Sequence, residues 1–159
     1  MDDHQLLLRQ TRHLHRWLTS ATADVTLADA MAMPGGAPSI AWQVGHLLRD
    51  AETTAEAVAG LAAQEEERGS APSWGCATDA DWDQLRARWQ TRSAACLAAL
   101  EGLLRADLDT PPLVELRADF GAHLETRRDF WSGHVFHMGY HLGQVGSLRA
   151  RLELGWWRS

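Results

Sequence analysis

The sequence predicts an all-α protein, a four-helix bundle with long connecting loops. Alanine and leucine dominate its 159 residues and β-branched residues are sparse, a composition that favours helices over strands. Apolar residues make up 45% and charged residues 23%, the balance of a soluble globular chain. Four segments carry apolar residues at helical spacing, separated by loops. The length fits a single helical-bundle domain spanning residues 1–159.

The first predicted helix runs from an acidic cap at Asp2 to about Ser20. A loop with two glycines and two prolines follows it. Ser39 is then a good N-cap for the second helix, which we expect to continue to about Gln64. The apolar stripe of that helix has the 3–4 spacing of a packed face and consists of Val44, Leu47, Leu48, Ala51, Ala55, Val58 and Ala62.

The third predicted helix starts at Thr78 or Asp79 and reaches about Asp107. The loop before it, residues 64–78, could act as a lid over a site, although its acidic start is equally typical of solvated surface. After the third helix the sequence is irregular, with at most a short strand at 113–116.

The fourth predicted helix opens with Thr126, and Asp129 three residues later completes a pattern that resembles a capping box. We expect this helix to continue to about Leu154, where Gly155 stops it. The connections between the four helices are longer than usual, so some of them are expected to cross an end of the bundle.

Charge and hydropathy exclude several classes of partner. The formal net charge is −6 and no basic stripe is present, which argues against nucleic-acid binding and against docking on anionic lipid. No apolar run approaches the roughly 20 residues of a membrane-spanning helix. The acidic start is unlike a secretory signal, and two cysteines, Cys76 and Cys96, do not form a disulfide framework. A reducing cytoplasm is the simplest location.

Three of the eight histidines, His134, His137 and His141, fall within eight residues of the fourth helix. They share an arc of about 100° with apolar residues such as Leu148, so they are expected to face the core. Imidazoles at i and i+4 sit one turn apart and can direct ring nitrogens at one metal ion. A hydrogen-bonded pair of core histidines explains the same pattern about equally well.

A mononuclear site needs a third ligand, and His46 on the second helix is the candidate. It lies roughly 150° away from the apolar stripe of that helix, among small and polar residues. Solvent exposure is therefore the simpler interpretation of its position. The alternative is a cleft inside the bundle, and Trp42, one turn earlier, is an unusual residue for open surface.

Two motifs resemble the DinB-like family of damage-inducible four-helix proteins, which are related to bacterial thiol-dependent transferases. The second helix carries Val44-Gly45-His46-Leu47. The fourth carries His137-Met138-Gly139-Tyr140-His141-Leu142-Gly143-Gln144, followed by Gly146-Ser147-Leu148-Arg149. The number and order of the helices agree as well, so the resemblance covers nearly the whole chain.

The resemblance implies that His46, His137 and His141 hold one divalent ion, with water in the remaining positions. Zinc or nickel is the first expectation and iron or copper the alternative. His134 is not part of the family's usual triad. We favour a core histidine, and the alternatives are a group that hydrogen-bonds the ligands from outside the triad or a base near the open coordination position. Asp50 and Gln144 are candidates to hydrogen-bond a ligand imidazole from outside the triad.

Three imidazoles leave an open position, the arrangement of a catalytic site. A bound water would suit a hydrolase, and a bound low-molecular-weight thiol would suit a thiol S-transferase acting in stress response or detoxification. A non-catalytic metal-binding stress protein is the third hypothesis. The resemblance also implies a homodimer, for which Trp156 and Trp157, if exposed, are candidate contacts.

Overall fold

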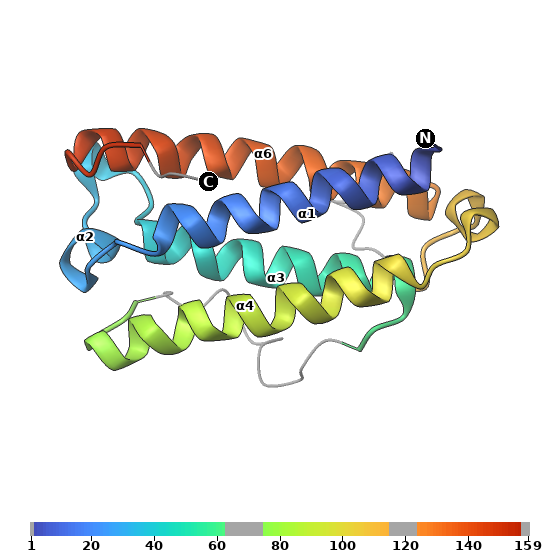
Figure 1. Ribbon diagram of the computed structural model, residues 1–159, viewed down its shortest axis with the longest axis horizontal. Helices are drawn as coiled ribbons and strands as arrows, with labels where there is room; N and C mark the ends of the chain where they lie inside the picture. Colours follow the sequence, from blue (N-terminus) through green and yellow to red (C-terminus); the bar gives the residue numbers. More distant parts are fainter. Residues whose placement is uncertain (1, 63–74, 115–123, 157–159) are drawn as a thin grey trace.

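The computed structural model describes residues 2–62, 75–114 and 124–156. All of the regular secondary structure in these ranges is helical, which confirms the predicted fold class (Figure 1). The four long helices are α1 (Asp3–Thr22), α3 (Ile40–Ala59), α4 (Asp79–Glu101) and α6 (Arg127–Arg151). Shorter elements are α2 (Leu27–Met31) and the 3-10 helices η1 (Pro34–Gly36) and η3 (Arg105–Asp109).

The four long helices form a bundle in which each has two neighbours. Helix α3 packs against α4 and α6, and α1 packs against the same two helices from the other side. Figure 1 shows that α1 and α6 run in one direction while α3 and α4 run in the opposite one. Because α3 and α4 are parallel, the end of α3 and the start of α4 lie at opposite ends of the bundle.

Polar side chains fix the starts of the helices where the sequence predicted them. The Asp2 carboxylate accepts from the backbone N–H of Gln5 at 2.9 Å, and Ser39 caps α3. Thr78 opens α4 and Thr126 opens α6, each within a complete capping box. These bonds satisfy backbone N–H groups that a first helical turn leaves without partners.

Three predicted helix ends were too late along the chain. Helix α3 ends at Ala59, not near residue 64, because Gly60 adopts a left-handed conformation (φ 72°) and its N–H bonds back to the helix. Helix α4 ends at Glu101, and η3 replaces the predicted helix to residue 107. Helix α6 ends at Arg151, slightly before the predicted end.

The loop after α1 contains a short helix that the sequence analysis missed. Thr26 caps α2 by accepting from the N–H of Asp29 at 3.2 Å. The predicted strand at 113–116 is wrong for its described half, since Leu113 and Val114 have no strand structure. The N–H of Leu113 instead donates to the carbonyl of Ala57 at 2.8 Å. Most of the proposed lid, residues 64–78, lies outside the described residues.

Helix α3 is buried on two faces, and this feature positions the site. Its apolar stripe packs in the main core, with Val44, Leu47, Leu48 and Ala51 at most 1% exposed. A second, polar face turns toward α6 and includes Gln43, which is also 1% exposed. A single apolar stripe in the sequence indicates only the first of these faces.

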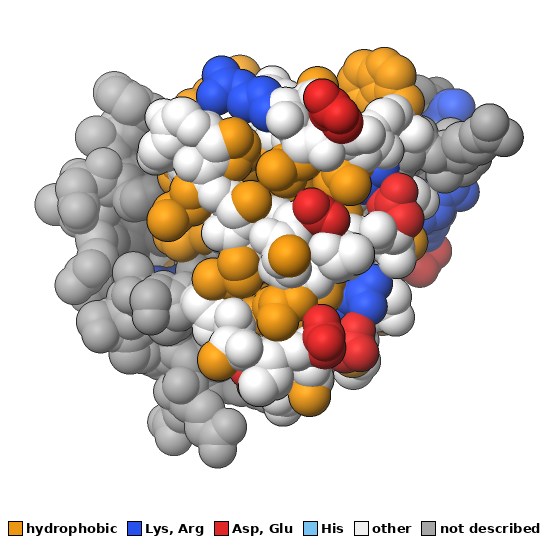
Figure 2. Space-filling view, turned by 90° about the vertical axis from the view of Figure 1, so that its left-hand side faces the viewer, with side chains coloured by type: hydrophobic (Ala, Val, Ile, Leu, Met, Phe, Trp, Pro, Cys, Tyr) orange, Lys and Arg blue, Asp and Glu red, His pale blue; other side chains and the backbone are white. Residues whose placement is uncertain are grey.

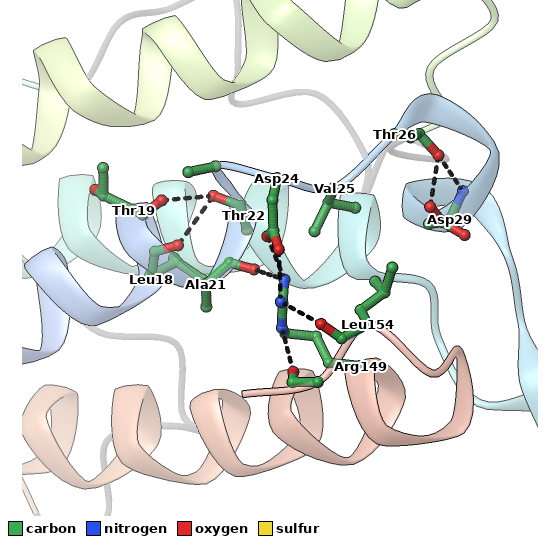
Figure 3. A network of polar contacts seen from close by, with 12 residues as sticks. Leu18, Thr19, Ala21, Thr22, Asp24, Val25, Thr26, Asp29, Arg149 and Leu154 are labelled. Atoms are coloured by element: carbon green, nitrogen blue, oxygen red, sulfur yellow. Dashed lines mark hydrogen bonds and ion pairs between the residues drawn. The ribbon is translucent and has the colours of Figure 1, made fainter. Parts of the chain in front are cut away.

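One buried arginine ties the end of α1 to the end of α6 (Figure 3). Arg149 is 1% exposed and forms a two-pronged ion pair with Asp24, with N···O distances of 2.6 and 2.9 Å. Its guanidinium also donates to the carbonyls of Ala21, Leu154 and Gly155. No described helix is long and apolar enough to cross a membrane.

We predict that Arg149→Met lowers the free energy of unfolding by about 2–3 kcal/mol, because it leaves buried carbonyls unpaired and breaks the ion pair. The loss stays below that of a fully buried pair because Asp24 is 59% exposed. Arg151→Met is the matched control, since Arg151 is exposed at the same end of α6. Urea unfolding followed by circular dichroism measures both, and equal losses in the two variants would contradict the prediction.

Candidate metal centre

Three histidines from two helices meet at the interface between α3 and α6. His46 comes from α3, and His137 and His141 come from successive turns of α6. The Nε2 atoms of His46 and His137 are 3.0 Å apart, and those of His137 and His141 are 2.8 Å apart. One ligand atom from each residue lies within 4.8 Å of the others. The structure therefore brings together the three residues singled out in the sequence, in a geometry that could hold a metal ion.

Asp50 lies behind the triad and bridges two histidines of α6. Its Oδ1 is 3.1 Å from Nδ1 of His137, and its Oδ2 is 2.6 Å from Nδ1 of His134. Asp50 thus occupies the outer position expected of it. His134 is 3% exposed, as expected for a core histidine, and orients Asp50 rather than joining the triad.

Gln43 orients the third imidazole, a role that the sequence analysis missed. Its Oε1 lies 2.5 Å from Nδ1 of His141. Gln144 was the expected candidate. Its side chain interacts with His141 and acts to raise the pKa of that imidazole, as its expected role requires, but its buried Oε1 makes no hydrogen bond of normal geometry with any described residue. Gln43, His46 and Asp50 succeed one another at intervals of three and four residues, so helical spacing alone could have identified Gln43.

The hydrogen-bond partners of His137 and His141 determine which ring nitrogens carry protons. Asp50 and Gln43 present oxygens to the Nδ1 atoms of His137 and His141, which places the imidazole protons there. With the protons placed there, the two Nε2 lone pairs face each other across 2.8 Å, and either a proton shared between them or a metal ion bound by both would offset their repulsion. Metal–imidazole bonds of about 2.0–2.1 Å allow two ligands on one ion to lie about 3 Å apart. The donor set therefore fits one divalent ion.

The electrostatics also favour neutral imidazoles at two of the three positions. Burial, reinforced by His137 and His46, lowers the pKa of His141 to about 4. Burial and His137 lower the pKa of His46 as well. The hydrogen bond to Asp50 raises the pKa of His137. Burial alone would raise the pKa of Asp50, but His134 and His137 hold it below its usual range. Asp50 is therefore an anion at neutral pH.

Trp42 explains why His46 lies away from the apolar stripe of α3. The indole stacks on the His46 imidazole, with ring centroids 4.7 Å apart and planes at 13°. Both side chains are half-buried against α6, so the face that sequence periodicity assigned to solvent is a second packing face. The stacking restricts the His46 ring and directs its Nε2 toward His137.

A fourth buried histidine, His15 of α1, extends the cluster toward the opposite side of the bundle. It is 3% exposed and packs edge-on against His134 and Trp89, with centroid distances of 5.8 and 5.0 Å. Neither ring nitrogen has a hydrogen-bond partner among the described residues. Burial, together with His134, lowers the pKa of His15 to about 3.

Neither cysteine provides a reactive thiol at this site. Cys76 and Cys96 are both free. Burial raises the pKa of Cys96 to about 12, and burial with the nearby Asp81 raises the pKa of Cys76. Both thiols are therefore protonated at neutral pH and poorly nucleophilic.

Comparison with known proteins agrees with this architecture. The family model described as the DinB superfamily matches residues 4–145. A solved structure, the "conserved protein of locus" from Enterococcus faecalis, superposes with a TM-score of 0.66 at 17% sequence identity. The match covers 94% of this chain and 96% of that one, and at this identity it shows a shared fold only. Among curated protein sequences, none is significantly similar to this chain.

We predict that His15→Phe reduces the loss of stability in acid. The folded-state pKa of His15 is about 3 and the unfolded value is about 6.5, so the unfolded chain binds the proton first. The stability that neutral His15 provides is therefore present above pH 6.5 and is lost as the pH falls toward 3. The loss is at most about 1.4 kcal/mol per pH unit for this one group.

Urea unfolding of the chelator-treated protein at pH 7.5 and pH 5 measures the effect. The His15→Phe variant should lose less stability between the two values than the wild type, because phenylalanine keeps the ring and cannot be protonated. Identical losses would show that His15 is not held neutral.

Proposed function

This chain belongs to the DinB superfamily, and from that premise we propose that it holds one divalent ion on His46, His137 and His141 and activates a small-molecule thiol for transfer to an electrophile. The observation that supports the metal site best is the pair of Nε2 lone pairs 2.8 Å apart, each fixed by a partner on its Nδ1. Zinc and nickel fit this donor set first, with iron or copper as alternatives.

The chain's own residues would orient the site and set its protonation. Asp50 holds His137, and Gln43 holds His141, so that both Nε2 atoms point to one place. Trp42 covers one face of His46 and limits the access of water to it. When bound, a divalent ion with three protein ligands would leave a position open and lower the pKa of a thiol or water placed there.

The surroundings of the triad favour a thiol over water as the activated group. Metal-assisted hydrolysis commonly uses a carboxylate as general base. Both oxygens of Asp50 are already bonded to histidines, and Glu52 is 3% exposed and paired with Arg92. A thiol, in contrast, needs only to lose its proton to solvent. Its sulfur then bonds to the electrophilic carbon while the leaving group departs with the bonding electron pair.

The proposal includes a role in detoxification or stress response and assembly as a homodimer. Trp156 is 81% exposed near the end of the described chain and fits a contact between subunits. Trp157 lies outside the described residues.

We predict that His141→Ala lowers divalent-metal affinity by more than about 100-fold while the helical content is retained. The matched control is His134→Ala, which removes a buried histidine one to two turns away on the same helix but no ligand. Because His134 orients Asp50, its loss should weaken binding by no more than about tenfold. Elemental analysis of the untagged proteins measures how much metal each variant retains after purification. One tightly bound ion in purified His141→Ala would overturn the triad.

We predict that low-molecular-weight thiols raise the melting temperature of the metal-loaded protein but not of the chelated protein or of His141→Ala. Glutathione, cysteine and 2-mercaptoethanol are suitable probes, and consumption of an aryl halide in their presence measures transfer. Ester hydrolysis that is abolished by chelation would favour a hydrolase instead. Tight metal binding with neither activity would favour a non-catalytic metal-binding protein.

A further inference from the structure

A pocket of about 420 Å³ opens beside the candidate metal centre, between the start of α3 and the C-terminal half of α6. Its lining includes Gln43, Tyr140, Gly143, Gln144 and Arg151. Two of these residues touch the triad directly. Gln43 bonds to Nδ1 of His141, and the Tyr140 ring packs edge-on against the His141 imidazole at 5.1 Å between centroids. The pocket therefore lies next to the triad, with Gln43 and Tyr140 between it and His141, and extends away along α6.

Gln144 lines this pocket at the end next to His141. Its side chain interacts with His141 and acts to raise the pKa of that imidazole, but its buried Oε1 makes no hydrogen bond of normal geometry with a described residue. An unpaired buried carbonyl is unfavourable by about 1–3 kcal/mol, so a ligand that carries an N–H or O–H group would gain by bonding to it. The position of Gln144, one turn beyond His141, places this acceptor close to the inner end of the pocket.

Arg151 supplies a positive charge at the other end. Its described contact is with the backbone carbonyl of Pro34 at 3.2 Å, and no described carboxylate pairs with it. In a chain with a net charge of −6, such an arginine in a pocket wall is a specific binding point for an anion. Figure 2 shows scattered basic side chains at this end of the bundle and no continuous basic band, which fits a single small anion better than a polyanion.

We propose that this pocket binds an elongated organic anion, with its anionic group against Arg151, a hydrogen-bond donor at Gln144 and its other end at the histidine triad. The ten residues from His141 to Arg151 span about 15 Å of helix axis, which sets the scale of the ligand. The inference rests on the proposed function for the reactive end of the ligand. Recognition of the anion depends on Arg151 and is independent of the metal.

Two glycines of α6 give a matched pair of variants for testing the pocket. Gly143 lines it, whereas Gly139, one turn earlier, does not. A Cβ atom added at either position meets no atom within 4 Å, so both positions have open space for a side chain. Gly143→Leu should fill the pocket, and Gly139→Leu should change the same helix without doing so. Arg151→Gln removes the positive charge.

The probes are ω-mercaptocarboxylates of three, six, eight and eleven carbons, each compared with the ω-mercaptoalcohol of the same length. Calorimetric titration of the metal-loaded protein should show that only the longer carboxylates bind better than their alcohols, by roughly threefold to fivefold, as expected for an exposed ion pair. The preference should shrink at high salt. The preference for the carboxylate should be lost in Arg151→Gln and kept in Gly139→Leu. Gly143→Leu should weaken the binding of the long carboxylates and of the long alcohols alike.

The proposal is overturned if carboxylates and alcohols bind equally at every length, if none of them binds, or if the preference survives in Arg151→Gln. Failure of the proposed function is recognised separately. Octanoate and octanol, which have no thiol, are titrated into the chelated protein, where a preference that depends on Arg151 would support the pocket even if the chain held no metal.

Discussion

The Asp50 carboxylate, shared between His134 and His137, is the interaction on which the rest of the candidate site depends. A carboxylate in the core of a helical bundle is unfavourable unless its charge and lone pairs are satisfied. The two imidazoles of α6 satisfy one oxygen each, at 2.6 and 3.1 Å. In return, the carboxylate fixes the proton of His137 on Nδ1 and leaves its Nε2 free to face His46 and His141. The contacts that assemble the triad are therefore part of the interface between α3 and α6.

The sequence indicated some parts of this arrangement and not others, for physical reasons. His137 and His141 could be placed because they share the core face of α6 with ordinary apolar residues. His46 could not, because α3 packs on two neighbours and periodicity shows only its apolar stripe. Its role rested on a resemblance between motifs. Gln43 was missed although its spacing from His46 and Asp50 places it near them on α3, because glutamine is more often an exposed residue of a helix than a buried one. Helix starts were predicted well from their caps, whereas the left-handed Gly60 and the 3-10 turn η3 set ends that apolar spacing does not show.

The three histidines of the triad are held in place by different kinds of contact. His137 and His141 are held through hydrogen bonds to Asp50 and Gln43, both on α3. His46 is held by stacking on Trp42, which restricts the plane of its ring. A triad fixed in this way needs little rearrangement to accept an ion, since its ring nitrogens already lie about as far apart as the ligands of one ion. Arg149 anchors the bundle near the far end of α6 through Asp24, so the two buried charge clusters stabilise different parts of the same helix.

The described residues around the triad supply no nucleophile and no free carboxylate, so in the proposed reaction the ligand would have to supply the reactive thiol. The described cysteines are held protonated, and both oxygens of Asp50 are committed to histidines. What the chain offers instead is a fixed triad and, next to it, a pocket with an unpaired acceptor at Gln144 and a cation at Arg151. Selectivity in such a site comes from the pocket, because three imidazoles distinguish poorly between one small thiol and another. The residues of α6 that line this pocket, with Arg151 at its far end, are therefore where selectivity for a substrate would be determined.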